Sequence, residues 1–177
     1  MKSYLKKLLV LLGALGALVV PSLFLAGCHP AELVIPSYLH TIGVEPVKNQ
    51  TSYFGLDTTF TQNLIRQFQV DARLTVDDPQ KADLLVKIII RQYNINPVFF
   101  DPKTNMVLQY QLTMTYDIAA IDQVEKKTLL EDTGKNHSVY YYTPQYVGAI
   151  TETQDQAANR MLGEAAELTV RRVLEGF

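Results

Sequence analysis

Residues 106–118 read MVLQYQLTMTYDI, and large apolar or aromatic side chains occupy every second position. Successive side chains of a β-strand point to opposite faces of the sheet. The even-numbered positions therefore form an apolar face and the odd-numbered ones, Val107 apart, a polar face. This pattern predicts a long strand in a sheet that is buried on one side and wet on the other.

The flanking segments predict two more long strands beside this one. Residues 84–93, LLVKIIIRQY, are rich in β-branched side chains. Between the two strands, 101–105 reads DPKTN, which is typical turn chemistry. After a second predicted turn at 122–127, residues 128–142 form the third strand. We therefore expect three long antiparallel strands joined by hairpins.

The remaining segments predict two helices and two shorter strands. A helix begins at Asp57 or Thr58, which are capping residues, and has apolar side chains at helical spacing. A second helix begins at Thr151 or Thr153 and runs to Glu175, with the pairs Arg160–Glu164 and Glu167–Arg171 on its solvated side. The apolar positions of the two helices are Phe60, Leu64, Ile65 and Phe68 in the first, and Ala158, Met161, Leu162, Ala165, Leu168 and Val173 in the second.

A strand is expected over 38–44, a short strand over 72–76, and a polar loop over 48–55. The predicted fold class is α/β, in the form of an α+β two-layer sandwich. Two helices pack on one face of a small, mixed, mostly antiparallel sheet, and the order is β-α-β-β-β-β-α.

The N-terminal residues 1–27 have the layout of a lipoprotein signal peptide. They carry three lysines, no acidic residue, and an uncharged run that ends in Leu25-Ala26-Gly27-Cys28. This ending resembles the bacterial lipobox, in which a peptidase cuts before the cysteine, the thiol receives diacylglycerol, and the new amine is acylated with palmitate. A membrane-spanning anchor is the alternative, but Pro21-Ser22 interrupts the apolar run.

Cys28 is the predicted lipidation site, and the chain has no other cysteine. Two or three acyl chains anchor a protein stably to a membrane, whereas one does so only marginally. We expect a lipidated linker over 28–36 and a folded domain over 37–177. In the enteric sorting rule, an Asp directly after the lipidated cysteine retains a lipoprotein in the inner membrane. Here His29 occupies that position. We therefore expect the protein in the periplasm-facing leaflet of the outer membrane of a Gram-negative cell envelope.

Charge argues against a nucleic-acid partner. The signal peptide holds three of the 16 basic residues and none of the 18 acidic ones, so the rest of the chain has 13 basic and 18 acidic residues. Neutralising a phosphate backbone needs a clustered basic excess.

No catalytic or metal-binding motif is present in the sequence. The three histidines lack the spacing of a zinc site, and Asp77-Asp78 precedes a proline, which is typical of a turn. Signatures of serine hydrolases, P-loop enzymes and dinucleotide-binding proteins are missing. We therefore expect a protein that is not an enzyme and uses no cofactor or metal ion.

Aromatic and basic side chains near the predicted hairpin ends are candidates for contact. Rigid aromatic residues with polar ends suit an interface, although they also pack well within sheets. Lys87 and Arg91 would project from the polar face alongside Tyr93, either to contact an anionic lipid or to keep that face soluble. The aromatic candidates are Phe99, Phe100, Tyr140, Tyr142 and Tyr146.

Several stretches resemble the lipopolysaccharide-assembly lipoprotein family, LptE. They are the run VEPVKNQT at 44–51, Gly55-Leu56, FTQNLIRQF at 60–68, KADL at 81–84, LLED at 129–132, the long hairpin and the terminal helix. The resemblance covers nearly the whole chain after Cys28, and the lipobox and strand order strengthen it.

The resemblance implies an α/β domain that plugs the lumen of the outer-membrane β-barrel LptD, helps that barrel assemble, and binds lipopolysaccharide. In the family a basic residue at the tip of the central hairpin is implicated in lipopolysaccharide binding, and Lys103 occupies that position here. Lys87 and Arg91 are further candidates, and the aromatic residues become candidates for the barrel interface. A second basic residue expected before the last helix is missing from 144–150.

A second function stays open at this stage. A periplasm-facing interaction lipoprotein of related α/β shape could activate a cell-wall enzyme or form part of a secretion pore, because several such families share a lipidated start followed by a strand and a helix.

Overall fold

A computed structural model describes residues 35–175. The predicted signal peptide, Cys28 and residues 28–34 of the predicted linker lie outside the described residues. Within 35–175, no helix combines the length and the apolar character needed to cross a membrane.

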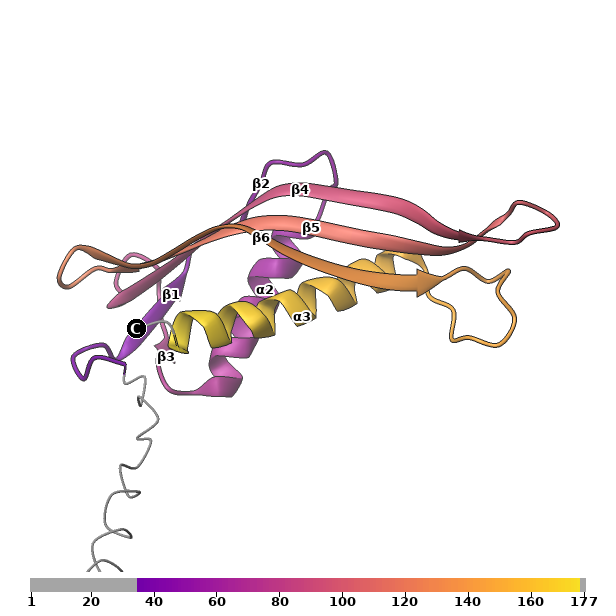
Figure 1. Cartoon of the computed structure of the whole chain (residues 1–177). Coiled ribbons are helices and arrows are strands. Elements are labelled where there is room, and N and C mark those ends of the chain that lie inside the picture. Colours follow the sequence, from indigo (N-terminus) through magenta and orange to yellow (C-terminus); the bar gives the residue numbers. More distant parts are fainter. Residues whose placement is uncertain (1–34, 176–177) are drawn as a thin grey trace, which may run out of the picture. The chain divides into compact units, whose positions relative to one another are not determined.

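Three long antiparallel strands form the greater part of the sheet (Figure 1). They are β4 (Leu84–Phe100), β5 (Val107–Asp122) and β6 (Lys127–Tyr142). Along β5, Leu112, Met114 and Ile118 are buried while their odd-numbered neighbours stay partly exposed. The alternation expected for 106–118 is thus confirmed from Leu108 onward and continues to Asp122. Met106 was wrongly placed on the apolar face, because it precedes the strand and is 48% exposed. The alternation fixes the register, because a slip of one residue would expose the whole apolar face.

Short parallel strands extend the sheet beyond β4. Strand β1 (Thr41–Val44) lies between β3 (Thr75–Val76) and β4, and both pairings are parallel. Strand β2 (Lys48–Asn49) pairs with Ile89 and Ile90 of β4. A polar loop was expected over 48–55, and this expectation was wrong for Lys48 and Asn49. These two residues form backbone pairs with the free edge of β4.

Helix α2 (Leu56–Asp71) packs through Phe60, Leu64 and Phe68, as its spacing predicts. Its N-cap is Gly55 in a left-handed conformation (φ 81°), with no side-chain cap. Asp57 and Thr58 were therefore wrong as caps. Glycine adopts this conformation without the cost that a Cβ atom imposes.

Helix α3 (Gln154–Glu175) begins after Thr153, which is confirmed as its cap. The Thr153 Oγ1 accepts the N–H of Gln156 at 3.2 Å, and the Gln156 side chain accepts the N–H of Thr153 at 2.9 Å. Leu168 was wrongly placed in the apolar stripe, because it is 46% exposed. The helix contacts both α2 and the sheet, so its buried face also takes in Ala166, Val170 and Leu174.

A β-bulge in β4 changes which residues share a face. The pairing with β5 shifts between Ile90 and Gln92, which leaves Arg91 as the extra residue. Tyr93 consequently lies on the buried face and is only 8% exposed. The expectation that Tyr93 projects alongside Lys87 and Arg91 was therefore wrong.

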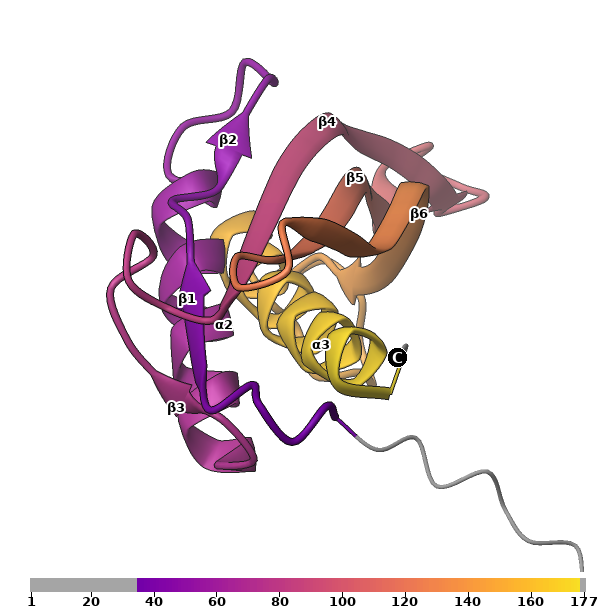
Figure 2. The same cartoon turned by 90° about the vertical axis from the view of Figure 1, so that its left-hand side faces the viewer.

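The predicted fold class is confirmed. Both helices cover one face of a mixed six-stranded sheet, in the expected order of elements apart from the small strand β2. In Figures 1 and 2, no helix or strand of residues 35–175 lies over the opposite face of β4, β5 and β6. We call this uncovered side the outer face.

Candidate functional site

The long strands have two unlike halves. The proximal half, residues 84–90, 116–122 and 127–132, pairs with β1 and β2 through β4. The distal half comprises residues 92–100, 107–115 and 136–142, and within the described part of the chain no further strand pairs with it. The distal half ends in the hairpin tip, 101–106, and leads into the loop 143–153 (Figure 1).

The hairpin tip is organised around Asp101. Its carboxylate accepts the backbone N–H groups of Lys103 at 2.7 Å and Thr104 at 2.9 Å, as the turn sequence predicts. These hydrogen bonds lower the pKa of Asp101, and the one from Thr104 has the larger effect. The turn leaves Lys103 exposed, and its ammonium group forms no ion pair with any residue in 35–175.

Three of the predicted aromatic residues lie together beside the tip. The ring of Tyr146 stacks on Tyr142 with a centroid distance of 4.7 Å and meets Phe99 edge-on at 6.2 Å. Phe99 and Tyr142 both sit opposite Gln109 of β5. Phe99 remains 45% exposed and Phe100 42% exposed. Residues from two strands and a loop thus form an aromatic cluster that still has free surface.

Further apolar side chains are exposed at this end. Val147 is 95% exposed and Ile150 is 90% exposed in the loop, and Val98 and Met106 are also exposed. Within 92–115 and 136–151, the charged residues are Asp101 and Lys103, with His137 as an additional titratable group. Exposed apolar surface gathered in one place is typical of an interaction site.

Tyr140 lies on the outer face, outside the aromatic cluster. Its hydroxyl accepts a hydrogen bond from Gln111 Nε2 at 3.0 Å, and its side chain is exposed.

Lys87 and Arg91 are engaged within the fold. Lys87 Nζ lies 3.1 Å from Glu45, and Arg91 Nε donates to Asp117 at 2.7 Å while its Nη1 donates to Gln50 at 2.8 Å. Burial acts to raise the pKa of Glu45, but the contacts with Lys87 and Lys48 together outweigh it and the pKa is lowered. Lys87 therefore belongs to the proximal half and Arg91 to the bulge that bounds it, and both lie away from Lys103.

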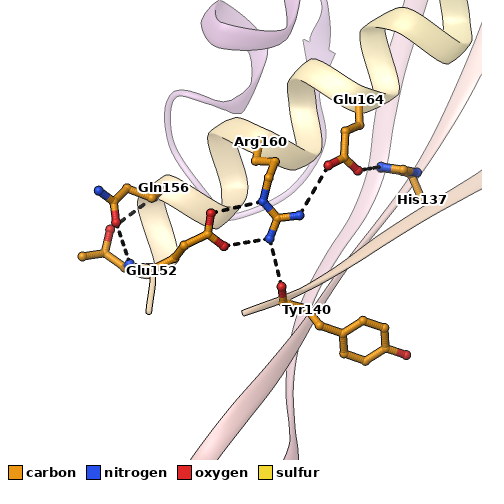
Figure 3. Close-up of polar contacts among 7 residues, drawn as sticks. His137, Tyr140, Glu152, Gln156, Arg160 and Glu164 are labelled. Atoms are coloured by element: carbon orange, nitrogen blue, oxygen red, sulfur yellow. Dashed lines mark hydrogen bonds and ion pairs between the residues drawn. The ribbon is translucent and has the colours of Figure 1, made fainter. Parts of the chain in front are cut away.

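Arg160 joins the start of α3 to β6, a connection that sequence reasoning missed (Figure 3). Its guanidinium binds both oxygens of Glu152, at 3.1 and 2.7 Å, and donates to the backbone oxygen of Tyr140 at 2.9 Å. It also reaches Glu164 at 3.4 Å, and Glu164 lies 3.1 Å from His137 Nε2. The spacing of Arg160 and Glu164 predicted that one pair, whereas no sequence pattern links Arg160 to a strand oxygen.

The side chains of Asp77 and Asp78 are engaged in the turn rather than paired with each other as an acid and a base. Asp77 and Asp78 accept backbone N–H groups within the predicted turn. In residues 35–175, no group of three His, Cys, Asp or Glu side chains is placed to hold a metal ion.

Comparison with solved structures shows the same fold in two bacterial proteins, CT253 and XCC0632, and also finds a weaker match. The hypothetical protein CT253 from Chlamydia trachomatis is 12% identical, with a TM-score of 0.52 over 77% of this chain and 96% of that chain. The protein XCC0632 from Xanthomonas campestris is 12% identical, with a TM-score of 0.51 over 78% of this chain and 85% of that chain. The rare lipoprotein B from Shewanella oneidensis is 14% identical, with a TM-score of 0.44 over 77% of this chain and 92% of that chain.

No curated protein matches the sequence. The family model described as LptE, lipopolysaccharide-assembly, matches residues 39–173, which include every described strand and nearly all of α3. The chain therefore belongs to the LptE lipopolysaccharide-assembly family.

Proposed function

We propose that this protein is an outer-membrane lipoprotein, anchored through acyl chains on Cys28, that assembles with and plugs an LptD-type β-barrel and binds lipopolysaccharide during its delivery to the outer leaflet. In this proposal the protein is a non-enzymatic subunit, residues 1–27 are removed, 28–36 form the linker, and 37–177 form the plug domain. The family match over 39–173 is the observation that carries the proposal.

The distal half supports the plug role. Its exposed aromatic and aliphatic side chains provide an interface that is almost free of charge, and such interfaces favour Tyr, Phe and Met at their centre. The outer face of the sheet is polar, which suits a wet lumen. Phe99, Phe100, Tyr142 and Tyr146 are the proposed barrel contacts, with Tyr140 beside them on the outer face.

Lys103 is the strongest candidate for contact with a lipid phosphate. It is exposed at the tip, whereas Lys87 and Arg91 would first have to leave Glu45 and Asp117. Separating a cation from its paired carboxylate costs free energy, and a lysine without an ion pair has no such cost. We therefore place lipopolysaccharide contact at the tip first and at Lys87 and Arg91 second.

The proposal is tested by purifying the tagged, lipidated protein from outer membranes in mild detergent and identifying its partners by mass spectrometry. We expect a barrel of LptD type at near-stoichiometric amount. The double variant Phe99→Ser, Tyr146→Ser should lower the recovered barrel strongly, because it removes two rings of the aromatic cluster.

The matched control is Phe54→Ser. Phe54 is 100% exposed but lies in the loop before α2, outside the distal half. Its loss should leave barrel recovery unchanged. If the unaltered protein is recovered alone, or with a cell-wall enzyme, the barrel assignment is wrong and the interaction-lipoprotein alternative takes its place.

A further inference from the structure

The outer face of the distal half carries an uncharged set of hydrogen-bonding side chains. Residues directly opposite one another on paired strands share a face, so the strand register defines rows across β4, β5 and β6. One row is Asn96, Gln111 and Tyr140, and the next is Asn94, Thr113 and Ser138. All six are exposed or half-buried. We call them the amide–hydroxyl face.

This face differs sharply from the outer face of the proximal half. Beginning at the bulge, that region carries the ion pairs of Arg91 with Asp117 and of Lys87 with Glu45. Sheets commonly use such charges to keep an exposed face soluble. The amide–hydroxyl face contains none, and it ends at the ring of Tyr142 and at Phe99.

Four of the six side chains of the amide–hydroxyl face contact one another in pairs. Gln111 Nε2 donates to the Tyr140 hydroxyl at 3.0 Å, and the hydroxyls of Thr113 and Ser138 lie 2.9 Å apart. Each amide and hydroxyl has more donor and acceptor capacity than these contacts use. These two hydrogen bonds orient four of the side chains before any ligand binds, which reduces the entropy cost of binding.

We propose that the amide–hydroxyl face binds neutral sugar residues, and that in the proposed function it contacts the saccharide portion of lipopolysaccharide. Sugar hydroxyls both donate and accept hydrogen bonds, as amides and hydroxyls do. The apolar C–H face of a sugar ring packs against an aromatic ring such as that of Tyr140, which is 52% exposed.

Charge complementarity favours this ligand over the alternatives. A phosphate or carboxylate would find no cation on the face, and a cationic segment would find no carboxylate. Lys103 lies beyond the last row, at the hairpin tip. The structure thus separates a face for neutral sugar from a single cation for phosphate.

The test uses the full lipidated protein in a zwitterionic detergent, because detergents with sugar head groups would compete. The probes are a lipid-free, dephosphorylated oligosaccharide prepared from lipopolysaccharide, and lipid A alone. Calorimetric titration should show binding of the oligosaccharide. The variants Gln111→Ala and Tyr140→Ala should each weaken it by about fivefold or more, the effect of one lost hydrogen bond or ring contact.

Two controls separate this site from others. Lys103→Gln should weaken the binding of lipid A far more than that of the oligosaccharide. Gln62→Ala, which alters an exposed glutamine on α2, should change neither the affinity for the oligosaccharide nor that for lipid A. Circular dichroism before titration verifies that each variant is folded.

The proposal is overturned if the unaltered protein does not bind the dephosphorylated oligosaccharide, or if Gln111→Ala and Tyr140→Ala bind it normally. Reduced barrel recovery for these variants with normal oligosaccharide binding would assign the face to the protein partner instead. Failure to recover any barrel concerns the proposed function and leaves the oligosaccharide titration interpretable by itself.

Discussion

The proximal and distal halves of the three long strands share one pleated sheet but differ in the side chains on their outer face. In both, the inner face is buried, as Ile88 in the proximal half and Leu112 in the distal half show. The outer face of the proximal half is held by ion pairs, whereas that of the distal half is uncharged and leads to exposed aromatic rings. The inner face thus supplies stability throughout, and the distal outer face is left free for contacts.

The largest expected effect comes from the shared core. Phe60 is fully buried and meets the ring of Tyr116 edge-on at 5.5 Å. Phe60→Ala should lower the free energy of unfolding by about 3–5 kcal/mol, because it removes a large side chain and leaves a cavity. Urea denaturation followed by circular dichroism measures the change. Phe54→Ala, on a fully exposed phenylalanine, should shift it by less than about 0.5 kcal/mol.

Alanine substitutions at two glycines should change the stability of the protein in opposite directions. A Cβ atom on Gly43 would lie 2.5 Å from the Cα of Pro79, so Gly43→Ala should destabilise the proximal sheet by about 1–3 kcal/mol. Gly163 lies within α3, and a Cβ there meets nothing within 4 Å. Gly163→Ala should stabilise the protein by about 0.5–1 kcal/mol. Equal effects in thermal unfolding would contradict this distinction.

A smaller effect should depend on pH. Hydrogen bonds from Arg160 lower the pKa of Glu152 in the folded protein. The stabilisation is therefore complete above the unfolded pKa, about 4.3, and is lost as the pH falls through the lower folded value. Glu152→Gln should cost about 1 kcal/mol at neutral pH.

Urea titrations of Glu152→Gln and the unaltered protein should converge as the pH approaches about 3. Glu167→Gln, which breaks an exposed pair with Arg171, is the control and should cost no more than a few tenths of a kcal/mol. A constant difference between the Glu152 variant and the unaltered protein at all pH values would rule out the Glu152–Arg160 pair as its source.

The smallest expected effect on stability is at the tip, where the effect on binding is largest. Lys103→Glu should leave the free energy of unfolding within about 0.5 kcal/mol of the unaltered protein, since the side chain is exposed and unpaired within 35–175. Binding of lipopolysaccharide should fall, because a carboxylate repels lipid phosphates. Unchanged binding with unchanged circular dichroism would remove Lys103 from the site.

Most of the candidate site could be located from sequence but not assembled from it. The turn at Asp101 and the aromatic residues near the hairpin ends are visible as patterns. The stacking of Tyr146 on Tyr142 and its contact with Phe99 depend on how the loop 143–153 returns to the sheet. Likewise, Lys87 and Arg91 are exposed candidates in sequence, whereas their partners are distant in the chain: Glu45 follows β1 and Asp117 lies in β5.

The sequence by itself determined the elements whose residues repeat with one period. The alternation in β5 specified both its faces, and the capping residues Thr151 and Thr153 placed the start of α3 to within two residues, because these signals involve neighbouring residues. The structure selected Thr153. The tertiary structure alone decided the bulge at Arg91, the short strand β2 and the exposure of Leu168. Each of these three features depends on a partner element that is distant in the chain. Free backbone groups pair with the strand that lies beside them, and a helix buries the side chains that its neighbours cover.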